Sequence, residues 1–248
     1  MNAPVKNISK LHGEGSFNDR IFDVMEHIEY RRIVTPEDFE NISQLRSKAF
    51  DAHNLYSHKL NGNAVDATDR MPNAQVFGMY FDEQLASTIR IAHVTPQHPE
   101  SQAVKIFPEV LKPLLAQGQS FVDPSRFAVD EDLSREVPGL ALLTLRIAFM
   151  ATKHYNVDAC LGLVTEDHVP FYRRVFRSTV IAGPKSTEEF VVKPVLFASP
   201  LRESEICSRY PLFYSTERER KLLFDTPATS MPPLTVLPTA KYAAAEAA

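Results

Sequence analysis

One stretch of the sequence decides the fold: Phe121-Val122-Asp123-Pro124-Ser125-Arg126-Phe127-Ala128-Val129-Asp130. Its apolar residues predict a buried β-strand, yet this strand also carries an acid, a hydroxyl and a guanidinium, at Asp123, Ser125 and Arg126. A carboxylate and a guanidinium are costly to remove from water unless they are paired or used. The stretch therefore predicts a strand that lines a functional site.

A second informative block follows an apolar strand predicted at residues 159–165. It reads Asp167-His168-Val169-Pro170-Phe171-Tyr172-Arg173-Arg174-Val175-Phe176 and predicts a short helix that carries a tyrosine and two adjacent arginines. Between the two blocks, Pro138-Gly139 begins a helix with apolar residues almost all round, so we expect that helix to be deeply buried.

The other elements are placed by periodicity, caps and turns. Thr35-Pro36-Glu37-Asp38 is a strong helix start, with a hydroxyl N-cap and a proline at the first helical position. The order is β-α-β-β-α-β-α-β-α-β-β, which predicts an α/β fold with a mixed central sheet and helices on both faces. Besides the two blocks, we expect strands at 28–34, 75–80, 85–92, 179–182 and 190–197. We expect helices at 36–53, 201–208 and 216–224, and one at 100–117 that is interrupted near Pro108 and Pro113.

Composition and charge narrow the class of protein. The 248 residues are 44% hydrophobic with a formal net charge of −4, which does not favour nucleic acid or an anionic membrane as partner. No stretch approaches the roughly 18 consecutive apolar residues of a membrane span, and residues 1–17 lack the apolar core of a signal peptide. Two cysteines without metal-ligand spacing predict a reduced, cytoplasmic protein with no metal site. We expect one domain, residues 25–225, between a flexible N-terminus (1–24) and a flexible C-terminal tail (226–248).

An ordered set of motifs is shared with a known group of enzymes. An early helix carries an Arg and a Phe four residues apart, and a loop then supplies two acids three residues apart. Residues 28–198 resemble the GNAT-type acyltransferases, and most closely their acyl-carrier-protein-dependent branch, the N-acyl amino acid synthases and autoinducer (acyl-homoserine-lactone) synthases. The residues that carry the resemblance are Arg46, Phe50, Asp66, Asp69, Arg90, Thr95-Pro96, Phe107-Pro108, Asp123, Ser125, Arg126 and Phe127.

Two departures from the autoinducer synthases bear on the substrate. Those enzymes usually have a Trp soon after the Arg/Phe pair, whereas this chain has no Trp. They also usually have Glu where this chain has Asp123, which is shorter by one methylene. The first difference disfavours S-adenosylmethionine and a lactone product, and favours the relatives that accept amino acids.

The resemblance implies which residues are catalytic and which bind the acceptor. Asp123, Arg126 and Tyr172 are the expected catalytic residues: Asp123 receives the acceptor's ammonium and its proton, and Tyr172 protonates the departing thiolate. The alternative interpretation is an architectural ion-pair network, with Tyr172 as a packed aromatic residue. The residues expected to bind the acceptor or shape its site are Arg46, Phe50, Asp66, Asp69, Arg90, Ser125 and Phe127.

The resemblance also implies how the acyl donor binds. In GNAT enzymes the pantetheine arm lies where two strands part, and amides at the next helix start receive phosphate. Here Glu136 stands where the coenzyme A-dependent enzymes have Arg or Gln, which favours the single phosphodiester of a 4′-phosphopantetheine arm on an acyl carrier protein. A first-turn acid placed for the helix dipole explains Glu136 equally well. The expected donor-binding residues are Val129, Gly139, Arg146, Arg173 and Arg174; a solvated basic face is the alternative for the arginines.

The leading hypothesis is therefore an N-acyltransferase that moves a fatty acyl group from an acyl carrier protein to the α-amine of an amino acid. We expect no permanently bound cofactor. The alternatives are an autoinducer synthase that uses S-adenosylmethionine and a non-catalytic GNAT-like protein that binds a lipid or a partner. A coenzyme A-dependent acetyltransferase is disfavoured by Glu136.

Overall fold

The computed structural model describes residues 15–229 and 234–247. Within them, one eight-stranded sheet runs in the order β6-β7-β5-β4-β3-β2-β1-β8. Every neighbouring pair is antiparallel except β4 and β5, which are parallel, so the predicted mixed sheet is confirmed. The strands are β1 (Ile28–Arg32), β2 (Ala74–Phe81), β3 (Gln84–Val94), β4 (Phe121–Val129), β5 (Ala159–Val164), β6 (Thr179–Ala182), β7 (Val195–Ser199) and β8 (Thr235–Val236).

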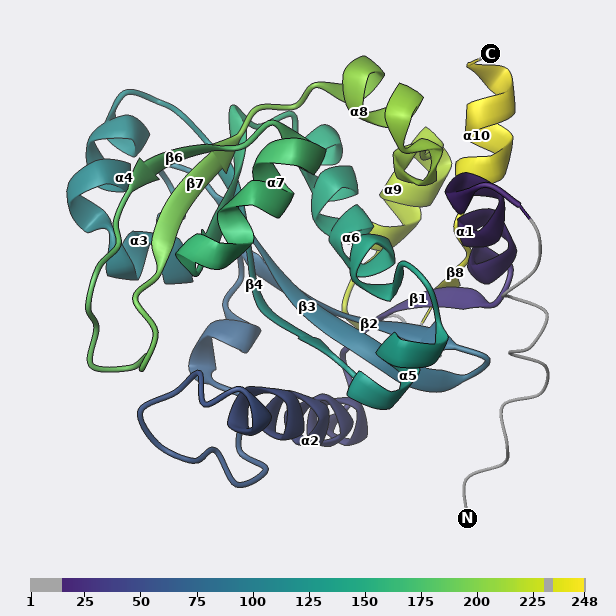
Figure 1. Cartoon of the computed structure of the whole chain (residues 1–248). Helices are drawn as coiled ribbons and strands as arrows, with labels where there is room; N and C mark the ends of the chain where they lie inside the picture. The colour runs from purple at the N-terminus through teal and green to yellow at the C-terminus, as the bar shows by residue number, and fades with distance from the viewer. Residues whose placement is uncertain (1–14, 230–233, 248) are drawn as a thin grey trace.

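Helices cover both faces of this sheet, as predicted. Figure 1 shows α6 and α7 on one side of β3 and β4 and α2 on the other. None of the helices in the described ranges is long and apolar enough to cross a membrane. The helices are α1 (Phe17–Met25), α2 (Pro36–Ala52), α3 (Gln102–Ile106), α4 (Pro108–Ala116), α5 (Glu131–Glu136), α6 (Leu140–Tyr155), α7 (Val169–Phe176), α8 (Glu203–Arg209), α9 (Glu217–Phe224) and α10 (Ala240–Glu246).

Local signals place several elements where the sequence predicts them. Thr35 caps α2 in a reciprocal capping box with Asp38, and Pro36 is the first helical residue. The β2–β3 hairpin turns at Asp82 and Glu83, which both have positive φ, the backbone geometry that tight hairpins need. The predicted helix at 100–117 is divided into α3 and α4, because Pro108 begins a new helix after Phe107.

The chain ends differ from the expected domain limits. α1 buries Ile21 and Val24 completely, although residues 17–24 fall in the expected flexible N-terminus. β8 pairs with β1 at Tyr30↔Val236, and α10 follows it, although both lie in the expected flexible tail. The capping box of α1, formed by Ser16 and Asp19, is a local sequence signal for this helix. Within those two segments, residues 1–14, 230–233 and 248 lie outside the described residues.

The strand expected at 190–197 begins five residues later than predicted. β7 begins at Val195, because residues 183–194 form a long loop after β6 that ends at Pro194, which has no N–H for a ladder. This loop reaches back to the loop after α2, where Tyr56 and Phe190 form an isolated β-bridge. The loop therefore pairs with the loop after α2 instead of extending the strand.

The feature that positions the site is a parting of β4 and β5. Their ladder contains only Phe121↔Ala159 and Val122↔Cys160. Beyond this point β4 continues beside β3 as far as Val129, whereas β5 continues beside β7. Backbone groups of β4 that face β5 past Val122 therefore have no strand partner and line a gap through the sheet.

Candidate active site

A cavity of about 350 Å³ occupies the gap between β4 and β5. Its lining is mostly apolar and comes from both sides of the sheet, so the cavity passes from the α6–α7 side to the α2 side. The lining on the first side includes Leu145, Ala148, Phe149, Thr152, Tyr172, Phe197 and Ile206, and on the second side Phe50, Leu55, Tyr56, Leu163, Phe190 and Val192. An apolar channel through the sheet fits a hydrocarbon chain.

Arg126 is turned toward this cavity by a β-bulge. Thr88 pairs with Ala128 and Arg90 pairs with Ser125, so three residue steps of β4 oppose two of β3. The bulge leaves Arg126 in the left-handed region, at φ 52°, which is uncommon for a residue other than glycine. Bulges of this kind re-aim side chains and are frequent beside active sites.

The Arg126 guanidinium is held by partners from the loop after α2. Nη1 donates to the Tyr56 hydroxyl, Nη2 donates to Asp66, and the guanidinium lies over the Tyr56 ring, 5.0 Å from its centroid. Burial lowers the pKa of Arg126, but Tyr56, Asp66 and Glu189 outweigh it and raise that pKa overall. Arg126 Nε is buried and has no hydrogen-bond partner among the described residues.

Asp66 and Arg90 extend the same ion-pair network to the next strand. Arg90 Nη1 donates to Asp66 at 3.0 Å, and Arg90 Nε donates to the Ser125 hydroxyl at 2.9 Å. Burial raises the pKa of Asp66, but Arg126 and Arg90 outweigh burial and lower it to about 2. The expected grouping of Asp66, Arg90, Ser125 and Arg126 is therefore present in the structure.

Arg46 and Asp69 form the buried end of this network. Arg46 Nη1 lies 3.0 Å from both Asp69 oxygens, and both side chains are fully buried. Burial lowers the pKa of Arg46 to about 10, with Asp69 opposing the shift. This pair borders neither the cavity nor the open hollow described below, whereas Phe50, one turn along α2, lines the cavity.

Asp123 does not lie where the sequence analysis placed it. The side chain is 0% exposed and absent from the cavity wall, because Asp123 shares the strand face of Phe121, which packs against α3 and α4. Its Oδ2 accepts the Ala103 amide at 2.8 Å at the start of α3, and burial raises its pKa. Asp123 is therefore not part of the cavity lining, and its Oδ1 is buried without a hydrogen-bond partner among the described residues.

Tyr172 and Phe127 line the cavity, as expected. Tyr172 comes from α7, and its ring packs 4.7 Å from that of Phe197. Burial raises the pKa of Tyr172 to about 12, so the hydroxyl keeps its proton at neutral pH. Phe127 follows the bulge and faces the core on the α6 side.

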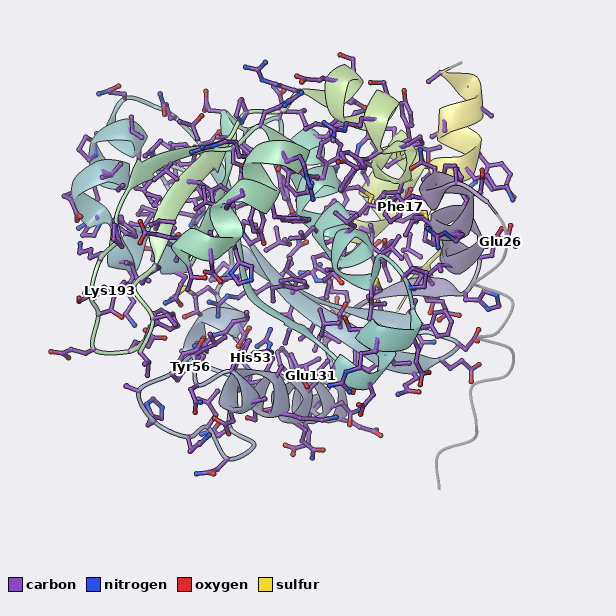
Figure 2. The ribbon with its side chains drawn as sticks, viewed as in Figure 1. Phe17, Glu26, His53, Tyr56, Glu131 and Lys193 are labelled. Atoms are coloured by element: carbon purple, nitrogen blue, oxygen red, sulfur yellow. The ribbon has the colours of Figure 1, made fainter. Side chains whose placement is uncertain are left out.

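The expected phosphate-binding turn before α6 is covered by protein. Gly139 has φ 76° and a Cβ added there would overlap the Ile21 side chain of α1. α5 lies between β4 and this turn, and its Glu131 pairs with His53 at the end of α2, as Figure 2 shows. Val129 packs against the core and is not part of the cavity lining.

Three arginines were expected to bind the donor, and for Arg146 the structure contradicts this prediction. It is 0% exposed and pairs with the fully buried Glu219, and it donates to the carbonyls of Leu212 and Tyr214. It lies on the helix that the sequence predicts to be deeply buried, so it cannot dock a partner. Arg173 and Arg174 are exposed on α7.

The sequence analysis did not predict several residues that lie beside the cavity. Tyr56 and Glu189 lie on two loops without periodic pattern, and the loops are joined by the bonds Ser57 N–Glu189 O (3.0 Å) and Val191 N–Leu55 O (3.0 Å). Figure 2 shows Tyr56 just beyond the end of α2. A second, more open hollow of about 780 Å³ adjoins the cavity here, and Tyr56 and Arg126 line both. No group of His, Cys, Asp and Glu able to hold a metal occurs among the residues described.

Known proteins share both sequence features and fold with this chain. A family model described as N-acyl amino acid synthase FeeM matches residues 41–199. The structure of FeeM from uncultured soil microbes is 19% identical with a TM-score of 0.59, over 71% of this chain and 92% of that chain. The acyl-homoserine-lactone synthase LasI is 16% identical with a TM-score of 0.52, over 71% of this chain and 89% of that chain.

A third solved structure is the coenzyme A-dependent acyl-homoserine-lactone synthase BjaI with SAM and isopentyl-CoA. It is 16% identical with a TM-score of 0.51, over 73% of this chain and 87% of that chain. At such identities, likeness of structure shows a common fold. No curated protein matches the sequence. Because the family model covers more than half of the sequence, the chain belongs to the N-acyl amino acid synthase FeeM family and is an N-acyltransferase.

Proposed function

We propose that this enzyme transfers a fatty acyl group from an acyl carrier protein to the α-amine of an amino acid, giving an N-acyl amino acid. The observation that supports the proposal is the apolar cavity through the sheet, which ends at a polar cluster: the ion pair of Arg126 and Asp66, and the Tyr56 hydroxyl. A hydrocarbon chain gains free energy by entering the apolar part. An amino acid is stabilised instead by the charged groups beyond it.

The thioester lies at the parting of β4 and β5 in this proposal. Unpaired backbone groups of β4 past Val122 face the gap and can bind the thioester carbonyl or the amides of the pantetheine arm. Tyr172, on the α7 side, delivers a proton to the departing thiolate. Arg126, on the α2 side, orients the acceptor. Asp123 becomes a positioning residue, because it holds the start of α3 and so places Gln102 beside Arg90.

Two features support an acyl carrier protein as donor. The turn before α6 is covered by Ile21 and flanked by the acids of α5, which disfavours the diphosphate of coenzyme A there. Arg173 and Arg174 are exposed on α7, which also carries the cavity-lining Tyr172, and they suit an acidic partner. We place this reaction in the cytoplasm, which fits the two free cysteines, Cys160 and Cys207.

A donor-by-acceptor matrix tests the proposal. Purified enzyme is incubated with acyl carrier protein or coenzyme A loaded with C4 to C16 chains, and with the twenty amino acids or S-adenosylmethionine. Mass spectrometry should detect an N-acyl amino acid, formed faster from the carrier protein. A lactone formed from S-adenosylmethionine would identify an autoinducer synthase instead. Absence of every product with verified donors would refute the proposal.

A further inference from the structure

The polar hollow beside the cavity has the charged lining that an acceptor site needs. It is lined by Asp66 and Arg126 on one side and by the loop that carries Glu188 and Glu189 on the other. It is open to solvent, and it meets the apolar cavity at Tyr56 and Arg126. A small charged molecule in this hollow therefore faces the end of a chain held in the cavity.

Glu189 places a carboxylate at this junction. Its Oε1 lies 3.7 Å from Arg126 Nη2, and its Oε2 lies 3.5 Å from the side-chain nitrogen of Gln102, which itself lines the cavity. Oε2 also contacts Lys105, 2.8 Å away, whose side chain is mostly exposed. The Glu189 side chain is partly accessible, so an incoming ligand can reach it.

The other acids near the cavity are less suited to receive an amine. Asp69 is fully buried in its pair with Arg46, and Asp123 is fully buried at the start of α3. Asp66 accepts hydrogen bonds from two enclosed guanidinium groups, those of Arg126 and Arg90, whereas the one short ion pair of Glu189 is with the mostly exposed Lys105 and its distance to Arg126 is 3.7 Å. The Nε of Arg126 is buried and has no partner among the described residues, so the guanidinium keeps one unused hydrogen-bond donor.

We propose that Glu189 is the catalytic carboxylate that binds the acceptor's ammonium group in this hollow and removes its proton. The proposal rests on the N-acyltransferase function above and assigns to Glu189 the role that the sequence analysis gave to Asp123. The Glu189 backbone carbonyl accepts the Ser57 amide, so the loop holds this position whatever the side chain does.

The proposed reaction balances in atoms and charge. The ammonium transfers one proton to Glu189, and the resulting amine attacks the thioester carbonyl carbon. A C–N bond forms and the C–S bond breaks, with its electron pair leaving on sulfur. The second proton lost by nitrogen ends on the thiolate, through Tyr172 or solvent. Glu189 then releases its proton to solvent through the open hollow, so one proton is liberated per turnover.

Matched substitutions test this assignment. Steady-state kinetics compare wild type with Glu189→Gln, Glu189→Asp and the control Glu109→Gln, whose carboxylate pairs with Lys185 but does not itself line the hollow. We expect E189Q to lower kcat/KM for the acceptor by about 10²-fold, the scale of general base catalysis, with little change in donor KM. E189D should recover part of the loss, and E109Q should match wild type. An E189Q value within about threefold of wild type, well below that scale, would overturn the proposal.

A binding measurement keeps this test independent of turnover. Calorimetry compares each of the twenty L-amino acids with its N-acetyl form, which lacks the ammonium. Wild type should prefer the free form of at least one amino acid by roughly 10- to 100-fold, the worth of one charge-assisted hydrogen bond, and E189Q should lose that preference. No preference in wild type, or the same preference in E189Q, would refute the role of Glu189. Failure of the donor matrix alone would refute only the acyl-transfer scheme.

Discussion

Ala148→Leu is the substitution that most directly asks whether the cavity holds the acyl chain. Ala148 lies on α6, is almost fully buried and lines the cavity together with Phe149 and Thr152 of the same helix. Leucine adds three carbons and is a good helix former, so the helix itself should be unaffected. The added carbons enter empty space, and we therefore expect the unfolding temperature to change little. Overpacking of a filled core would instead cost about 1–3 kcal/mol.

The expected loss depends on chain length. Each buried methylene contributes about 0.8 kcal/mol, so displacing three of them from the longest accepted chain costs about 2.4 kcal/mol. This corresponds to a roughly 60-fold lower kcat/KM for that chain. Chains shorter by three or more carbons should react at the wild-type rate. The optimum should therefore move to a shorter chain by two to four carbons.

The assay is a series of acyl donors in two-carbon steps, read as kcat/KM for each length. The control is Ala116→Leu, the same change at an exposed site at the end of α4, which should leave the profile as in wild type. An equal loss at every chain length would mean that the added side chain disturbs the site without shortening it. An unchanged profile would mean that the chain lies elsewhere, and the cavity argument would fail.

Three further predictions concern stability and proton transfer. Glu219→Ala should destabilise the fold by about 3–5 kcal/mol in urea unfolding, because it leaves the buried guanidinium of Arg146 without a counterion; a loss below about 1 kcal/mol would contradict this. The pKa of Asp66 is about 2 in the folded protein, below the ordinary value of about 3.9, so its contribution to stability is present above about pH 4 and is lost as the pH falls toward 2. Asp66→Asn should therefore flatten that part of the plot of unfolding free energy against pH. An unaltered plot would argue against the network. Tyr172→Phe should lower the single-turnover rate by roughly 10²- to 10⁴-fold if the tyrosine protonates the thiolate, whereas an unchanged rate would leave it a packing role.

The predictable part of the fold depended on local signals. The Thr35 cap and the turn between the strands expected at 75–80 and 85–92 each depend on a few adjacent residues, so the sequence alone places them. The network of Arg126, Asp66 and Arg90 was also predicted, through its resemblance to the motifs of the acyltransferases. Its members were expected together, and the structure brings them together.

The missed parts depended on contacts between distant segments. Tyr56 and Glu189 lie on irregular loops far apart in the sequence, and no periodicity shows that these loops meet at the bridge Tyr56↔Phe190. The burial of Arg146 could have been predicted, because an arginine on a helix that is apolar almost all round needs a buried partner. Its partner, Glu219, could not be identified from the spacing of residues in the sequence. Asp123 offered another, because strand alternation puts it on the face of Phe121.

Burial divides the ion-pair network into two parts with different consequences. Arg46 and Asp69 are fully enclosed and have no access to the cavity or the hollow, so we infer that they act architecturally, by fixing the loop that carries Asp66. Asp66 and Arg126 border the hollow, and there an acceptor's carboxylate can compete with Asp66 for the guanidinium. We therefore propose the architectural role for Arg46 and Asp69, and the substrate-binding role for Asp66 and Arg126. In this proposal the enclosed pair holds in place the pair that borders the hollow, so that a single run of motifs serves both structure and chemistry.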